Sequence, residues 1–124
     1  MLPELRDKLK TGTPIEKEEV LYVFMEYRIV ELVPDVIAAI LDSTPLPRDG
    51  DTGWGYVYHQ AATALCNFAY KIDGITQKQR GYKQFSFFND GGIASEQRRQ
   101  EVYGNWLKWW KQNKTKIFRS KLKE

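Results

Sequence analysis

Two residues of this chain have side chains suited to nucleophilic catalysis, the single histidine His59 and the single cysteine Cys66. A thiol nucleophile requires a base within hydrogen-bond distance, and here that base would have to be His59. Both residues fall in one predicted helix, seven positions apart, which separates them by about 10 Å along the helix axis. That separation is too large for proton transfer. The better interpretation of Cys66, in the apolar context ALCNF, is a buried and unreactive thiol.

Metal, phosphate and acid–base sites are equally hard to assemble from the sequence. No HxxxH, CxxC or paired histidine–carboxylate pattern predicts zinc. The segment Asp49-Gly50-Asp51 lacks the further oxygen ligands and the closing glutamate of a calcium loop. Gly91-Gly92 lacks the lysine of a phosphate-binding loop, and Glu18 and Glu19 fall on the solvent face of a helix. The sequence therefore predicts a protein that is not an enzyme and that holds no metal or cofactor.

The carboxyl-terminal part of the chain is strongly basic. Residues 108–124 contain seven basic residues and one acidic residue. Five of the basic residues are candidates for contact with nucleic acid: Lys108, Lys111, Lys114, Lys116 and Arg119. Lysines interspersed with tryptophans could bind phosphates and stack bases. The alternative interpretation is a solvated helix end, favoured by the helix dipole, followed by a frayed tail, and we favour it because the periodic tryptophans predict a buried face.

Composition and charge limit the class of protein. A chain of 124 residues with 42% hydrophobic residues fits a single domain over residues 1–124. The longest apolar run is too short to cross a membrane, and five charges among the first ten residues do not resemble a signal segment. Together with the lone cysteine, this predicts a cytoplasmic protein. Residues 1–51 carry a net charge of −5 and residues 52–124 a net charge of +8, which predicts two electrostatically different surfaces.

The elements that would position these residues are predicted to be helices. Leucine spacing predicts a helix over residues 2–10, and a threonine cap at Thr13 with glutamate at Glu16 predicts the start of a second helix ending near residue 27. Pro34 predicts a break and a new short helix to about residue 43. A Pro/Gly-rich loop over residues 43–55 then leads to an apolar helix over residues 56–72.

These helices form a weak internal repeat, because LPEL at residues 2–5 matches VPDV at residues 33–36. The segments VPDVIAAILD and HQAATALCNFAYKIDG together resemble one HEAT-like (armadillo-type) repeat, and the amino-terminal unit is a weaker copy. The resemblance covers residues 2–74. It implies an all-α fold in which two HEAT-like helix pairs stack as a short α-solenoid.

The remainder of the chain is predicted to complete this solenoid. Residues 75–94 show no clean period and are interpreted as an irregular, aromatic-rich connector. Ser95 is predicted to cap a last helix over residues 95–114, whose tryptophans form a broad aromatic face that covers the end of the solenoid. Within this helix, Gly104 is expected to let a neighbouring helix come close. Residues 115–124 are expected to form a basic tail.

This architecture predicts a module for protein–protein contact, because stacked helix pairs offer surface shape rather than reactive groups. The module could serve as an adaptor, a scaffold or a bacterial immunity-type inhibitor. The candidate contact residues lie on the acidic second helix and on the long loop: Glu18, Glu19, Arg48, Asp49, Asp51 and Trp54. Trp54 either packs under its loop or faces the partner. No membrane contact is expected, and a nucleic-acid-binding protein that uses the basic end is the alternative.

Overall fold

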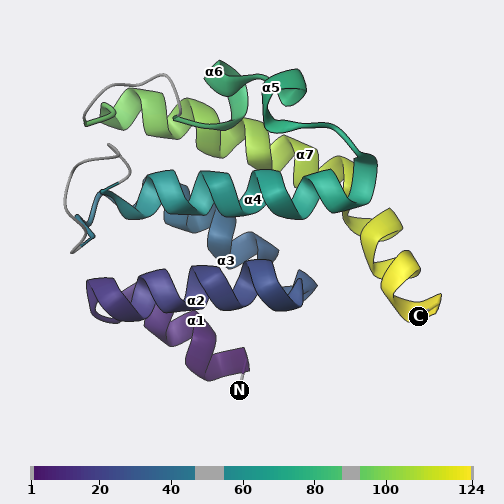
Figure 1. Cartoon of the computed structure of the whole chain (residues 1–124), viewed down its shortest axis with the longest axis horizontal. Coiled ribbons are helices and arrows are strands. Elements are labelled where there is room, and N and C mark those ends of the chain that lie inside the picture. The colour runs from purple at the N-terminus through teal and green to yellow at the C-terminus, as the bar shows by residue number, and fades with distance from the viewer. Residues whose placement is uncertain (1, 47–54, 88–92, 124) are drawn as a thin grey trace.

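The computed structural model of the chain describes residues 2–46, 55–87 and 93–123, and this part is all-α (Figure 1). It contains no β-strand, only an isolated antiparallel bridge between Pro45 and Tyr56. The elements follow one another in the order α1 (Leu2–Thr11), α2 (Pro14–Tyr27), η1 (Val30–Leu32), α3 (Val33–Ala38), η2 (Ala39–Leu41), α4 (Val57–Asp73), α5 (Gln77–Arg80), α6 (Tyr82–Phe85) and α7 (Glu96–Lys123).

The start of α2 follows the predicted capping box. The Thr13 side chain accepts a hydrogen bond from the Glu16 backbone N–H at 3.2 Å, and the Glu16 carboxylate accepts one from the Thr13 backbone N–H at 2.9 Å. These bonds satisfy two donors that a helix start otherwise leaves unpaired. The hydrogen bonds also hold the pKa of the Glu16 carboxyl below its usual range, since they favour its charged form. The capping-box prediction is confirmed.

The break near Pro34 is also confirmed, although the new helix begins one residue earlier than expected. The single 3₁₀ turn η1 precedes α3, which starts at Val33 and places Pro34 in its first turn. Proline is tolerated there because the first-turn N–H groups have no intrahelical acceptor. The short helix ends in a second 3₁₀ turn, η2, instead of continuing as α-helix to residue 43.

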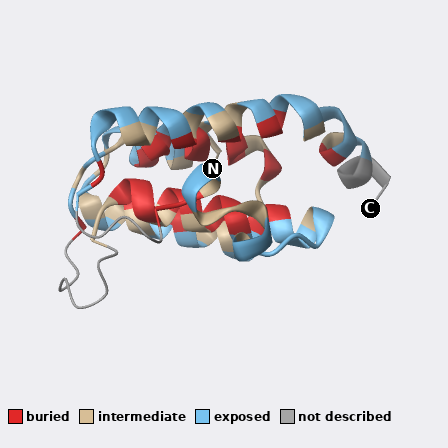
Figure 2. Cartoon of the chain, turned by 90° about the horizontal axis from the view of Figure 1, so that it is seen from above, coloured by how far each residue is buried: buried red, intermediate tan, exposed pale blue. Residues whose placement is uncertain are grey.

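Helix α4 is the central element of the molecule, and it contacts α2, α3, η2 and α5. Its inward residues are fully buried, and the Phe68 ring stacks on Phe24 of α2 with centroids 5.2 Å apart. Seen from above, the buried residues face the space between two rows of helices and the exposed residues lie outside (Figure 2). The helix ends at Gly74, whose left-handed conformation (φ +70°) closes the last turn, as the sequence predicts.

The connector after α4 differs from the irregular segment expected. It contains two one-turn helices, α5 and α6, separated by Gly81 at φ +111°. A second capping box explains α5, since Thr76 and Gln79 exchange side-chain-to-backbone hydrogen bonds. The left-handed φ of Gly81 then allows a sharp turn that a residue with a side chain would resist.

The last helix is longer than expected. Helix α7 reaches Lys123, nine residues beyond Lys114, so the region expected as a tail is helical. Ile117 is buried, and the Phe118 ring lies edge-on to Trp110 at 5.8 Å. Short isolated helical turns are marginally stable in water, and these apolar contacts help to stabilise the helix around residues 110–118.

The aromatic face of α7 packs inward as predicted. Trp106, Trp109 and Trp110 are buried, and the Trp106 indole N–H donates to the Phe85 carbonyl at 2.8 Å. The guanidinium of Arg80 lies 5.7 Å from the Trp106 ring and binds both carboxylate oxygens of Asp73 at 2.7 Å. The prediction for Gly104 is wrong: it is exposed, and nothing lies within 4 Å of the position a Cβ would take.

Candidate protein-binding surface

The two residues suited to nucleophilic chemistry are part of the core. The Cys66 thiol is buried, and burial raises its pKa to about 12, so it is protonated at neutral pH. His59 is also buried, with its ring 4.8 Å from Tyr58 and 5.5 Å from Phe87. The Cys66 thiol lies 3.8 Å from the Phe85 carbonyl of α6, so both side chains contribute to packing between α4 and residues 85–87.

In the described part of the chain, no group of three or more histidine, cysteine or acidic residues is placed to hold a metal ion. Within the same residues, no helix combines the length and the apolar character required to span a bilayer.

Lys17 on α2 is turned away from solvent, although the residues on either side of it are acidic. Its ammonium group donates to the Asp42 carboxylate at 2.6 Å, with the Lys17 side chain 9% exposed and that of Asp42 21% exposed. Asp42 also accepts a hydrogen bond from the Thr44 backbone N–H at 2.9 Å. Burial raises the pKa of the Asp42 carboxyl, but the hydrogen bonds from Lys17 and Thr44 outweigh burial and lower it.

The inward orientation of Lys17 leaves the outer surface of α2 acidic and partly apolar. Ile15 is 55% exposed and Tyr22 is 45% exposed, and seven residues place them two turns apart on one side of the helix. Glu19 is exposed between Ile15 and Tyr22, and Glu26 is exposed one turn beyond Tyr22. Glu18 is half-buried at the edge of this side of the helix. We refer to the surface formed by Ile15, Glu18, Glu19, Tyr22 and Glu26 as the acidic face of α2.

The sequence identified only part of this surface. Glu18 and Glu19 were expected contact residues and they lie on it, whereas Ile15 and Tyr22 were missed. In the sequence Tyr22 lies between Leu21 and Phe24, which are both on the buried side of α2. The apolar pattern of this segment therefore did not distinguish Tyr22 from the core residues. Exposed large apolar side chains are informative where they cluster with charge on one helix face. The other expected contact residues lie outside the described part of the chain: Arg48, Asp49, Asp51 and Trp54.

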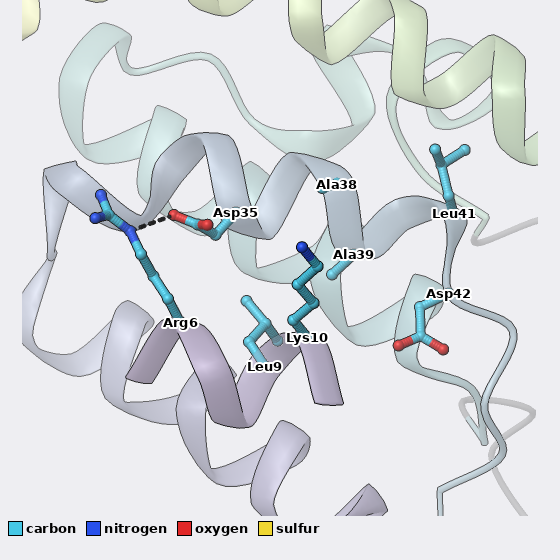
Figure 3. A pocket seen from close by; sticks show the side chains of 8 residues that line it. All are labelled: Arg6, Leu9, Lys10, Asp35, Ala38, Ala39, Leu41 and Asp42. Atoms are coloured by element: carbon cyan, nitrogen blue, oxygen red, sulfur yellow. Dashed lines mark hydrogen bonds and ion pairs between the residues drawn. The ribbon is translucent and has the colours of Figure 1, made fainter. Parts of the chain in front are cut away.

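A groove with a volume of about 400 Å³ lies between α1 and the α3–η2 segment (Figure 3). Arg6 closes one end by donating to the Asp35 carboxylate at 3.0 Å and to the Glu31 carbonyl at 3.1 Å. In Figure 3 the Lys10 side chain extends from α1 toward Ala38 and Ala39. The sequence signal for this groove is the pair of alanines, whose small side chains leave the space that a larger residue would fill.

The candidate nucleic-acid-binding residues are all on the solvent side of α7. Every one of the five is exposed: Lys108, Lys111, Lys114, Lys116 and Arg119. The tryptophans of the same helix face inward, so this surface offers charge without an aromatic platform.

Comparisons of the chain with protein-family models, with curated proteins and with solved structures found no match.

Proposed function

We propose that this chain works by binding another protein, as an adaptor, scaffold or inhibitor with no catalytic step. The acidic face of α2 is the contact surface. The observation that carries this proposal is the combination of two exposed large side chains, Ile15 and Tyr22, with the exposed carboxylates of Glu19 and Glu26 on the same side of the helix. Lys17, the one basic residue within α2, is bound to Asp42 on the inner side of the helix.

The chemistry of the face defines the kind of partner. Tyrosine is among the residues that contribute most binding energy at protein interfaces, since it buries a large ring and keeps a polar group at its edge. The surrounding carboxylates at Glu19 and Glu26 favour a partner with lysine or arginine around an apolar centre. Such charges act mainly on the association rate and on specificity, so the binding should weaken as salt is raised.

The arrangement of helices that presents this face is proposed to be two stacked HEAT-like pairs, α1 with α2 and α3 with α4. Contacts between α1 and α3 and between α2 and α4 support the proposal, since equivalent helices of successive pairs meet in such a stack. In this arrangement α7 covers α3 and η2 on the side away from α1 and α2 (Figure 1). The outer surface of α2 is then left open at the other end.

The proposal is tested by comparing three tagged forms of the full chain in affinity purification from the native source. The wild type is compared with the double variant Glu19→Lys/Tyr22→Ala. A matched control is Tyr70→Ala/Lys71→Glu, because Tyr70 is 50% exposed on α4 and Lys71 beside it is also exposed. Each variant replaces an exposed tyrosine and reverses one neighbouring charge.

We expect one protein to be retained by the wild type and the control, and to be lost with the Glu19→Lys/Tyr22→Ala variant. Circular dichroism and thermal melting establish that all three forms are equally folded. Equal retention by both variants, or no retained protein with any of the three forms, would contradict the proposal.

A further inference from the structure

The helical continuation of α7 changes what its basic residues can do. In a frayed tail, Lys116 and Arg119 would move independently of Lys108 and Lys111. In the structure all four belong to one continuous helix, and Ile117, next to Lys116, is buried. The spacing of the basic residues is therefore set by helix geometry.

The spacing of the basic residues places their charges on the outer side of the helix. At 3.6 residues per turn, Arg119 lies about 20° around the helix from Lys108, Lys111 about 60° to one side and Lys116 about 80° to the other. Lys114 lies about 120° from Lys108, so the five exposed side chains spread over the solvent half of the helix. We refer to these five residues as the basic ridge.

No acidic residue lies within the stretch of α7 that carries the basic ridge. The sequence from Val102 to Lys123 contains no aspartate or glutamate. Within the described part of the chain, no ion pair involves any of the five ridge residues, whereas Arg6, Lys17 and Arg80 pair with Asp35, Asp42 and Asp73. The helix dipole favours cations only in the last turn, so it does not account for Lys108 and Lys111.

We propose that the basic ridge binds the phosphate backbone of a double-stranded nucleic acid without reading its sequence. The ridge from residue 108 to residue 119 is about 17 Å long, and a duplex presents one phosphate charge about every 1.7 Å of its axis. Lysine ammonium groups bind phosphates as point charges and require no fixed base geometry. The buried tryptophans leave no surface on which bases could stack, so contact is limited to the backbone.

An anionic membrane fits this surface less well. Helices that bind membranes in the interfacial plane insert apolar side chains below their basic ones. The large apolar side chains of α7 are turned into the molecule: Val102, Trp106, Trp109, Trp110 and Ile117 are buried. This proposal is independent of the acidic face, which lies on the other side of the α3–α4 layer (Figure 1).

The test measures fluorescence anisotropy of a labelled, mixed-sequence DNA duplex of about 20 base pairs, which is longer than the ridge. If five contacts neutralise five phosphates, the plot of log Kobs against log salt has a slope of about −4.5. Affinity then falls about 500-fold between 50 and 200 mM salt. Equal affinity is expected for a second duplex of unrelated sequence. Absence of binding at the lower salt concentration, or a preference for one sequence, overturns the proposal.

Two charge-matched double variants locate the site. Lys108→Glu/Lys111→Glu removes two ridge contacts, and Lys8→Glu/Lys10→Glu makes the same change at two exposed lysines of α1. The ridge variant should reduce the salt slope by about 1.8 and raise Kd at least about tenfold, while the α1 variant should leave the slope unchanged. Equal losses would mean that net charge and not the ridge drives binding. Binding of the wild type to phosphatidylserine vesicles with no binding to the duplex overturns the proposal in favour of a membrane.

Discussion

Helices α2 and α7 lie on opposite sides of the α3–α4 layer (Figure 1). The two helices differ in the sign of the charge on their outer surfaces. On α2 the one lysine is drawn inward by Asp42, which leaves glutamates outside. On α7 the five ridge residues are outside, and no acidic residue follows Glu101 within the helix. The acidic face of α2 and the basic ridge therefore present opposite signs of charge to solvent. The net charge of +3 is a sum over the whole chain and says little about either surface.

The inner sides of the two helices differ as well. Helix α2 buries aliphatic residues and Phe24, whereas α7 buries three tryptophans, of which Trp106 also donates a hydrogen bond to Phe85. Both inner sides are packed, so the outer sides are free to differ without changing the fold. Residues on the inner sides hold the helices in place, and residues on the outer sides are available to a partner.

The largest expected effect is on the inner side of α7. Replacing Trp106 with alanine should lower the free energy of unfolding by about 3 to 5 kcal/mol, because the side chain is fully buried and leaves a cavity. Chemical denaturation followed by circular dichroism measures the change. Lys108→Ala, two residues further on the exposed side, is the control and should change stability by no more than about 0.5 kcal/mol. Similar effects of the two substitutions would mean that the inner and outer sides of α7 are wrongly assigned.

A smaller effect is expected at the ion pair that turns Lys17 inward. Asp42→Asn should lower the free energy of unfolding by about 1 to 2 kcal/mol at neutral pH, since it weakens charge-assisted hydrogen bonds with Lys17 and Thr44. The pair is not fully shielded from water, and this keeps the effect below that of a deeply buried pair.

The same substitution has a pH signature. The folded-state pKa of Asp42 lies below that of an unfolded aspartate, about 3.9, so the folded protein binds fewer protons there. The stabilisation from Asp42 is therefore present above that pH and is lost as the pH falls through the folded-state pKa. Melting temperatures of the wild type and Asp42→Asn should converge below about pH 4. A gap that stays constant as the pH falls would contradict the assigned role of the carboxylate.

Much of the fold was predictable because its signals are local. The capping box at Thr13 and Glu16, the break at Pro34 and the stop at Gly74 depend on residues a few positions apart. The apolar stripe of α4 is long enough to be unambiguous. Such features reflect hydrogen bonding and backbone geometry within one segment, so neighbouring residues in the sequence are enough to predict them.

Most of the incorrect predictions concern segments whose structure depends on contacts with residues distant in the sequence. The one-turn helices α5 and α6 are too short for a periodic pattern, and they are held by contacts with α7, including hydrogen bonds from Asn105 to the Gln84 carbonyl and from Trp106 to the Phe85 carbonyl. The end of α7 was missed although a signal existed, because Ile117 follows Trp110 by seven residues and continues its stripe. The inward orientation of Lys17 depends on Asp42, 25 residues away, and no local pattern reports it.

The smallest expected effect is on the two outer surfaces, where single charge reversals should leave stability almost unchanged. Glu19→Lys on α2 and Lys111→Glu on α7 should each alter the free energy of unfolding by no more than about 0.5 kcal/mol, because both side chains are exposed. Any change at position 111 should be an increase in stability, because glutamate there would remove repulsion with Lys108 and Lys114, three residues to either side. Denaturant titrations of both variants and the wild type in the same buffer measure the difference. A loss of more than about 1 kcal/mol at either position would mean that the charge stabilises the fold, and that surface could then no longer be regarded as free for a partner.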